Sequence, residues 1–276
     1  MAELPKDIQA VVGLALDEDI GPGDITAALV PTDSRARAII ISRESAVLCG
    51  SAWVNEVYRQ LDTQITLQWH CADGDAIRPD DVICELAGPA RALLTGERTA
   101  LNFLQCLSGT ATLTRHYVER VKGSGCRILD TRKTIPGLRS AQKYAVACGG
   151  GVNHRMGLYD AVLIKENHII AAGGIAAAVS QAKTADKKIQ VEVETLEELQ
   201  QAIDAGADAV LLDNFSIETL RQAVSLARGC ITLEASGGID ETTLGNIAAT
   251  GVDYISIGAL TKHVKAIDFS MRFTTP

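Results

Sequence analysis

Cationic side chains gather in one short stretch of an otherwise acidic chain. Between Asp130 and His168 there are six Lys or Arg residues against three Asp or Glu residues, a local balance of +3, whereas the whole chain carries a formal net charge of -8. The cations lie among glycines and follow short apolar runs. Such a cluster predicts a binding site for a small polyanion, and a solvated basic face is the alternative. The cations of this stretch are Arg132, Lys133, Arg139, Lys143, Arg155 and Lys165.

The composition of the chain disfavours several other kinds of partner. Aromatic residues make up 4% of the sequence and the net charge is negative, which argues against nucleic-acid binding. No apolar run is long enough to span a membrane, and the N-terminal residues lack the basic-then-apolar pattern of a signal peptide. The seven cysteines are odd in number and widely spaced. We therefore expect reduced thiols in a cytoplasmic protein rather than a disulfide framework.

The first part of the chain mixes helices with short strands. Helical spacing of apolar residues predicts helices over residues 5–17 and 51–61, and a long helical pattern covers 90–122. Within it Arg98 lies seven residues after Arg91, so the two share a face, and a surface ion pair explains Arg98 on sequence alone. Runs rich in β-branched residues predict strands over 35–42, 46–50, 63–69 and 82–88.

Beyond residue 122, short apolar runs alternate with helical or loop segments. This alternation predicts parallel strands with right-handed crossovers, as in an α/β barrel or a doubly wound sheet. The C-terminal tail has no further unit of this kind, so we expect residues 266–276 to return to an N-terminal domain of residues 1–108, with the α/β domain over 109–265. The expected strands are 127–129, 162–164, 189–191, 210–212, 231–233 and 254–257.

Five of these six strands are followed directly by a residue with an ionisable side chain. In α/β barrels the carboxyl ends of the strands line the active site, so the pattern predicts an active site at this end of the barrel. Two glycine loops, 236–238 and 257–259, close the last two strands and precede helices. Glycine lets backbone N–H groups approach an anion, so these loops are candidates for a phosphate site, with simple tight turns as the alternative. The five ionisable residues that follow these strands are Asp130, Lys165, Glu192, Asp213 and Glu234.

Seven strings, in order along the chain, closely resemble quinolinate phosphoribosyltransferase, also called carboxylating nicotinate-nucleotide pyrophosphorylase. The resemblance implies an N-terminal α+β sandwich followed by an incomplete α/β barrel of about six strands. It also implies a homodimer with shared active sites and a reaction of NAD biosynthesis. In that reaction quinolinate and 5-phosphoribosyl 1-pyrophosphate give nicotinate mononucleotide, pyrophosphate and carbon dioxide, with magnesium. The strings are Glu97–Asn102, Asp130–Thr134, Gly151–Arg155, Lys165–His168, Glu192–Glu194, Leu212–Asn214 and Glu234–Gly238.

The resemblance also implies a role for each matching residue. Lys165, Glu194 and Asp213 would be catalytic, with Lys165 at the sugar diphosphate or the reacting centre and the two acids on the ribose hydroxyls and magnesium. Arg98 would reach the quinolinate site from the neighbouring subunit. The carboxylates of quinolinate would be bound by Arg132, Lys133, His154 and Arg155. The 5-phosphate would lie on Ser236, Gly237, Gly238 and Gly258, and the remaining predicted substrate contacts are Thr131, Ile257 and Ala259.

The residues themselves leave three alternatives open. A barrel aldolase could use Lys165 as a Schiff base, since a lysine at a strand end permits that chemistry. A related phosphoribosyltransferase could use another acceptor in the same fold. A non-catalytic sensor of phosphorylated metabolites is the third alternative, although the acids and the lysine expected of an enzyme are all present.

Overall fold

The computed structural model describes residues 3–274, which form two compact units. The first unit comprises Met1–Arg115, Thr134–Gly150 and Leu260–Pro276, as far as these ranges are described, and the second comprises His116–Lys133 and Gly151–Ala259. The segment Thr134–Gly150, expected in the barrel domain, belongs to the first unit because its Ala141 and Ala145 are part of that unit's buried core. The predicted boundary between residues 108 and 109 stays a prediction.

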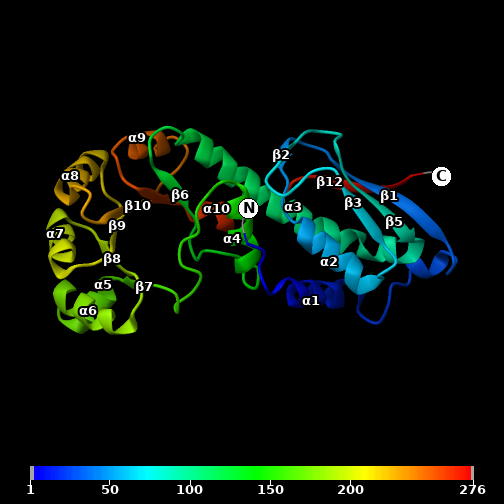
Figure 1. The fold of residues 1–276 in the computed structure, drawn as a ribbon, viewed down its shortest axis with the longest axis horizontal. Coiled ribbons are helices and arrows are strands. Elements are labelled where there is room, and N and C mark those ends of the chain that lie inside the picture. Colours follow the sequence, from blue (N-terminus) through cyan, green and yellow to red (C-terminus); the bar gives the residue numbers. More distant parts are fainter. Residues whose placement is uncertain (1–2, 275–276) are drawn as a thin grey trace. The chain divides into compact units, whose positions relative to one another are not determined.

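An antiparallel sheet organises the first unit. Its four strands lie in the order β12-β1-β5-β3, and β2 and β4 form a separate pair. The C-terminal strand β12 runs beside β1 over its whole length (Figure 1), with Arg37 opposite Thr274 and Ser42 opposite Phe269. The tail therefore joins the sheet of the first unit. The strands are β1 (Arg35–Ser42), β2 (Ala46–Val47), β3 (Thr66–Trp69), β4 (Ala76–Ile77), β5 (Val82–Pro89) and β12 (Phe269–Thr274).

Helices pack apolar faces into the core of this unit. The helix α2 buries Trp53, Val54, Val57 and Tyr58, which recur at helical spacing. The helix α3 is one continuous helix of 31 residues. At Gly96 in α3, an added Cβ would lie 2.7 Å from the ring of Tyr58, so glycine permits the close approach of the two helices. The helices are α1 (Ile8–Ile20), the 3-10 turn η1 (Ala27–Leu29), α2 (Ser51–Leu61), α3 (Ala90–Arg120) and α4 (Arg139–Cys148).

Six parallel strands form the sheet of the second unit, in the order β6-β11-β10-β9-β8-β7. The helices α6 to α9 lie outside these strands (Figure 1). Next to β6 the chain at Val152 forms a single parallel bridge to Leu129, and the sheet has no ladder between β6 and β7 among the described residues. The predicted incomplete α/β barrel of about six strands is therefore confirmed. The strands are β6 (Arg127–Leu129), β7 (Val162–Ile164), β8 (Ile189–Val193), β9 (Ala209–Asp213), β10 (Thr232–Ser236) and β11 (Tyr254–Ser256).

The crossover helices of the second unit begin with local capping signals. Thr195 accepts a hydrogen bond from the backbone N–H of Glu198, and Ser216 accepts one from Thr219, so each satisfies a free N–H of the first turn. Gly206 follows α7 in the left-handed conformation and ends that helix. The helices are α5 (Glu166–Ala172), α6 (Ile175–Ala182), the 3-10 turn η2 (Lys183–Ala185), α7 (Leu196–Ala205), α8 (Ile217–Ala227), α9 (Leu244–Ala248) and the short α10 (Ala259–Lys262).

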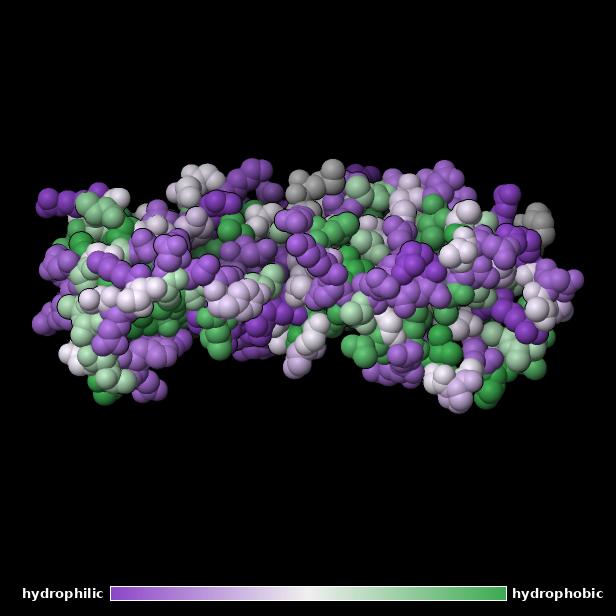
Figure 2. Space-filling view, turned by 60° about the horizontal axis from the view of Figure 1, so that its bottom comes forward, coloured by the Kyte–Doolittle hydropathy of each residue, from purple (hydrophilic) through white to green (hydrophobic). Residues whose placement is uncertain are grey.

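The surface is a fine mixture of polar and apolar side chains. Figure 2 shows hydrophilic residues interleaved with smaller hydrophobic patches over the face in view. Several large apolar side chains of the N-terminal region are exposed, among them Leu14, Ile25 and Leu29. No helix within residues 3–274 is long and apolar enough to cross a membrane.

Candidate active site

The carboxyl ends of the parallel strands bring most of the predicted residues to one edge of the second unit. Adjacent parallel strands point the same way, so the residues that follow them meet at that edge. Lys165 follows β7, Asp213 ends β9 and Ser236 ends β10. Arg98 is the exception, because it lies in the first unit on α3, with an exposed side chain.

Two lysines and two carboxylates form the exposed side of this site. The ammonium of Lys165 makes an ion pair with the Glu192 carboxylate, and the Lys165 side chain is 48% exposed. Burial and the nearby Glu192 raise the pKa of the Asp213 carboxyl, whereas Lys165 and Lys133 oppose that rise. We call Lys133, Lys165, Glu192 and Asp213 the exposed charge cluster.

Glu192, rather than Glu194, is the acid beside Lys165. Both residues lie near the end of β8, and alternation along a strand puts Gln190 and Glu192 on the same face. Glu194 lies beyond the last residue of β8, its side chain is exposed, and its backbone N–H donates to Glu198 Oε2 at 2.8 Å. The catalytic and metal-binding role predicted for Glu194 stays a prediction, but the described contacts favour Glu192 for it.

The two glycine loops differ in their local structure. An added Cβ at Gly237 would lie 2.1 Å from Asn214 Oδ1, and Gly237 has φ +96°, so only glycine fits there. Gly238 also has positive φ, but α9 begins at Leu244, so this loop does not lead directly into a helix as expected. At Gly258 an added Cβ would approach Lys133 Cδ to 2.8 Å, and α10 follows at once. Ile257 is buried, and Ala259 opens α10.

The other side of the site is a partly buried, hydrogen-bonded corner around His154. The fully buried Asp130 accepts hydrogen bonds from Asn153 Nδ2 at 2.7 Å and from the His154 N–H at 2.8 Å. Arg155 Nη1 donates to the Ala161 carbonyl at 3.1 Å. Burial and the neighbouring Arg132 lower the pKa of the Arg155 guanidinium. Two close guanidinium groups predict an anion site, because an anion relieves their repulsion.

Arg132 itself supports this interpretation. Its Nε atom is buried and has no hydrogen-bond partner among residues 3–274. An unpaired buried donor is costly, so a ligand acceptor at this place would stabilise the protein. Thr131 stabilises the turn, because its Oγ1 accepts a hydrogen bond from the Lys133 N–H at 3.0 Å.

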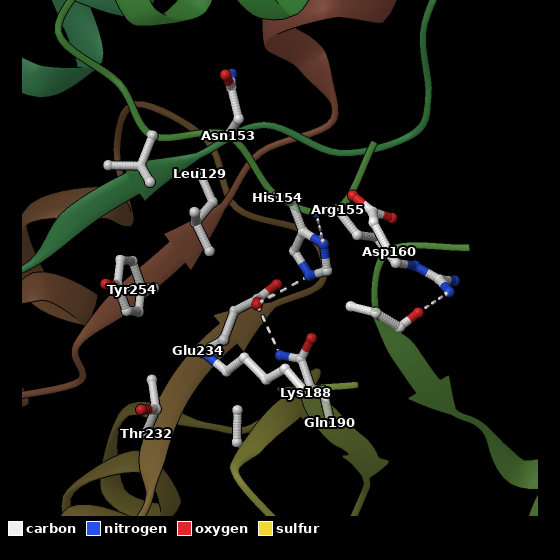
Figure 3. A pocket seen from close by; sticks show the side chains of 13 residues that line it. Leu129, Asn153, His154, Arg155, Asp160, Lys188, Gln190, Thr232, Glu234 and Tyr254 are labelled. Carbon is white, nitrogen blue, oxygen red and sulfur yellow. Dashed lines mark hydrogen bonds and ion pairs between the residues drawn. The ribbon is translucent and has the colours of Figure 1, made fainter. Parts of the chain in front are cut away.

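A pocket of about 330 Å³ extends from this corner into the second unit (Figure 3). The wall on the strand side reaches Thr232 and Tyr254, which are the first residues of β10 and β11. Inside the pocket Glu234 Oε2 accepts a hydrogen bond from Gln190 Nε2 at 2.8 Å and lies 3.2 Å from His154 Nε2. The sequence placed Glu234 among the ionisable strand ends but predicted no individual role for it, and it predicted no role for Gln190. The signal available for both was a polar residue in a strand rich in β-branched residues.

The fold and the site together define an α/β-barrel enzyme that acts on small anionic substrates. Family models for quinolinate phosphoribosyl transferase match the chain twice, the N-terminal domain over residues 24–108 and the C-terminal domain over residues 110–272. The chain therefore belongs to the quinolinate phosphoribosyltransferase family and is a phosphoribosyltransferase.

Individual relatives agree with this assignment. A probable carboxylating nicotinate-nucleotide pyrophosphorylase of Bacillus subtilis (strain 168) is 45% identical over 260 residues, which are 93% of this chain and 90% of that protein. A chloroplastic enzyme of the same name from Arabidopsis thaliana is 38% identical over 98% of this chain and 83% of its own length. The solved nicotinate-nucleotide pyrophosphorylase of Francisella tularensis is 53% identical, with a TM-score of 0.96 over 99% of this chain and 98% of that one.

Proposed function

We propose that the protein transfers the phosphoribosyl group of 5-phosphoribosyl 1-pyrophosphate to quinolinate and releases carbon dioxide. The observation that carries this proposal is the pair of neighbouring guanidinium groups, Arg132 and Arg155, at the same strand edge as the exposed charge cluster. The pair of guanidinium groups suits a dicarboxylate, and the lysines of the exposed charge cluster suit a sugar diphosphate. Family membership supports both assignments.

The proposed chemistry requires orientation and charge more than a nucleophilic side chain. Departure of pyrophosphate leaves positive charge on the ribose, which Glu192 and Asp213 stabilise in this proposal. Lys165 and Lys133 neutralise the diphosphate, and Arg132 and Arg155 hold the quinolinate so that its ring nitrogen attacks the sugar. Once alkylated, the ring nitrogen carries positive charge and stabilises the carbanion that decarboxylation leaves on the adjacent carbon.

The exposed charge cluster offers only some of the ligands that a magnesium ion needs. Asp213 and Glu192 offer the carboxylate oxygens that this ion prefers. After burial, the second cause that raises the pKa of Asp213 is repulsion from Glu192, which a cation would relieve. Within residues 3–274, the only compact group of three metal-type ligands is Cys49, Asp73 and Cys148 of the first unit. Substrate oxygens would therefore complete the magnesium shell. The chemistry that magnesium supplies when bound is neutralisation of the diphosphate charge.

The aldolase alternative has less support. A Schiff-base lysine must lose its proton before it attacks a carbonyl carbon. In this structure the Lys165 side-chain nitrogen is already engaged by the Glu192 carboxylate.

One assay tests the proposal directly. Purified protein is incubated with carboxyl-labelled quinolinate, 5-phosphoribosyl 1-pyrophosphate and magnesium, and released carbon dioxide is measured beside nicotinate mononucleotide. We expect both products, and kcat/KM for nicotinate lower by tens- to a hundredfold, since one charge-assisted carboxylate contact is lost. Comparable use of the two acids, or no carbon dioxide, would contradict the proposal.

We further propose a cytoplasmic homodimer in which Arg98 completes the neighbouring subunit's site. The seven cysteines are all free thiols, which is typical of a reducing compartment. A two-fold interface makes the exchange of Arg98 reciprocal. The variants Arg98→Ala and Lys165→Ala should each be nearly inactive, whereas co-expression in equal amounts should restore about a quarter of the sites. Verified hybrid dimers without recovered activity would place Arg98 outside the neighbour's site.

A further inference from the structure

The imidazole of His154 is held by the protein at both ring nitrogens. Nδ1 accepts the backbone N–H of Arg155 at 2.7 Å, and Nε2 lies 3.2 Å from Glu234 Oε2. A ring nitrogen that accepts a hydrogen bond carries no proton, so the proton of the neutral ring resides on Nε2 and is donated to Glu234. Figure 3 shows the ring between these two partners.

The carboxylate of Glu234 lies in a buried position, where a negative charge is unusual. Its side chain is 3% exposed and lies in the middle of β10. Burial alone would raise the pKa of its carboxyl, but the interaction with His154, followed by those with Ser256 and Gln190, outweighs that effect and holds the pKa below its usual value. Both contacts are made by Oε2, whereas Oε1 is buried and has no hydrogen-bond partner among residues 3–274. A buried carboxylate that fixes a histidine tautomer is a recurrent positioning device.

The contacts continue from His154 to the proposed quinolinate site. The Arg155 N–H is tied to His154 Nδ1, and the Arg155 guanidinium donates to the Ala161 carbonyl. The imidazole ring therefore links Glu234, on β10, to the backbone of Arg155, one of the cations of the proposed quinolinate site. Without the Glu234 charge only the Arg155 N–H would favour the Nε2–H tautomer. The other tautomer, in which an Nδ1–H faces the Arg155 N–H, would then become more accessible.

We propose that Glu234 is a positioning residue for the acceptor site: it fixes the tautomer and orientation of His154 and thereby the position of Arg155. The role of Glu234 in substrate binding rests on the proposed function, because it assumes that Arg155 binds quinolinate. The tautomer that Glu234 imposes does not depend on that assumption. The two parts are therefore tested separately.

The first test is made on the unaltered protein without substrate. Long-range ¹H–¹⁵N correlation spectra distinguish protonated from unprotonated imidazole nitrogens, and the chain has five histidines. The His154 signals are assigned by their loss in His154→Phe. We expect His154 to be in the Nε2–H tautomer, and mixed tautomers in Glu234→Gln. A dominant Nδ1–H tautomer in the unaltered protein would overturn the inference even if every variant failed to fold.

The second test is kinetic. Glu234→Gln keeps the shape of the side chain and removes its charge, and we expect KM for quinolinate to rise about ten- to a hundredfold. The kcat and the KM for the sugar diphosphate should change by less than about threefold, because the exposed charge cluster is untouched. Thr232→Val is the control, since Thr232 lines the same pocket, and it should leave KM for quinolinate within about twofold.

A double variant separates positioning from general support of the fold. If Glu234 acts through His154, then Glu234→Gln combined with His154→Phe should match His154→Phe alone in kcat/KM for quinolinate. Independent, multiplying effects would show that Glu234 does not act through the ring. If the protein does not use quinolinate at all, the proposed function fails, while the tautomer measurement still decides the role of Glu234 toward His154.

Discussion

The two sides of the site are built in different ways. In the corner around His154 and Arg155 these two residues are partly buried, and the buried carboxylates of Asp130 and Glu234 hold His154 before any ligand arrives. In the exposed charge cluster, Lys165 is half exposed and is balanced mainly by Glu192 and Asp213. Variants of the buried corner should therefore alter acceptor binding and stability, and variants of the exposed cluster should alter kcat.

The largest effect is expected from the lysine of the exposed cluster. Lys165→Ala should lower kcat by roughly 100- to 1,000-fold, because the transition state loses a charged contact, and should leave quinolinate binding little changed. Steady-state kinetics and quinolinate titration measure the two quantities. Lys187→Ala is the control, since Lys187 is an exposed lysine outside the cluster. A raised KM for quinolinate with an intact kcat would assign Lys165 to the acceptor side instead.

A paired substitution sharpens the comparison at the end of β8. Glu192→Gln removes the partner of Lys165 and should lower kcat by about 10- to 100-fold. Glu194→Gln changes an exposed residue beyond the strand and should alter kcat by less than about threefold. The two variants have the same chemistry two residues apart, so each is the control for the other. The reverse order of effects would restore Glu194 as the catalytic acid.

The pair Glu192 and Glu194 also shows what could not be predicted from the sequence. Local periodicity predicted the bounds of β1 and α2 correctly, because each element follows from its own pattern of apolar or β-branched residues. The role of Glu194 was implied by the family resemblance. The predicted strand stopped two residues too early, so the sequence did not show that Glu192 lies inside β8 and Glu194 beyond it. Strand ends are set by pairing with neighbours, which a local pattern does not contain.

Two other features depended on contacts between distant segments. Glu234 and His154 are separated by 80 residues and meet across the inside of the second unit. The residues of α4 resemble those of any amphipathic crossover helix, so their place in the core of the first unit was not predictable from spacing. In both cases the sequence gives the residue types, and tertiary packing decides their partners.

An intermediate effect is expected where backbone geometry supports the proposed phosphate site. Gly237→Ala places a Cβ against Asn214 Oδ1 and also strains a residue at φ +96°. We expect KM for the sugar diphosphate to rise about tenfold, with stability reduced by roughly 1–3 kcal/mol. Gly123→Ala is the control, because Gly123 has φ +86° and nothing within 4 Å of the added Cβ. Equal KM values in the two variants would remove the 236–238 loop from the phosphate site.

The smallest effect concerns stability in the exposed charge cluster. Burial and Glu192 raise the pKa of Asp213, so the folded protein binds that proton more tightly than the unfolded chain does. The resulting stabilisation is complete below the ordinary pKa of Asp, near 4, and is lost as pH rises through the higher folded pKa. At pH 7 the charged Asp213 therefore opposes folding slightly.

Asp213→Asn removes this charge and should raise the melting temperature at pH 7 by on the order of one or two degrees, although kcat falls. The difference should shrink as pH is lowered toward 4, where Asp213 in the unaltered protein becomes protonated and the repulsion from Glu192 is relieved. Asp186→Asn is the control: Asp186 is exposed in the same unit, and its φ of 49° suits asparagine equally well. Thermal unfolding of the unaltered protein and the two variants at pH 7 and near pH 4 measures these differences in melting temperature. A lower melting temperature of Asp213→Asn at pH 7 would mean that the lysines stabilise the Asp213 charge more than burial and Glu192 oppose it.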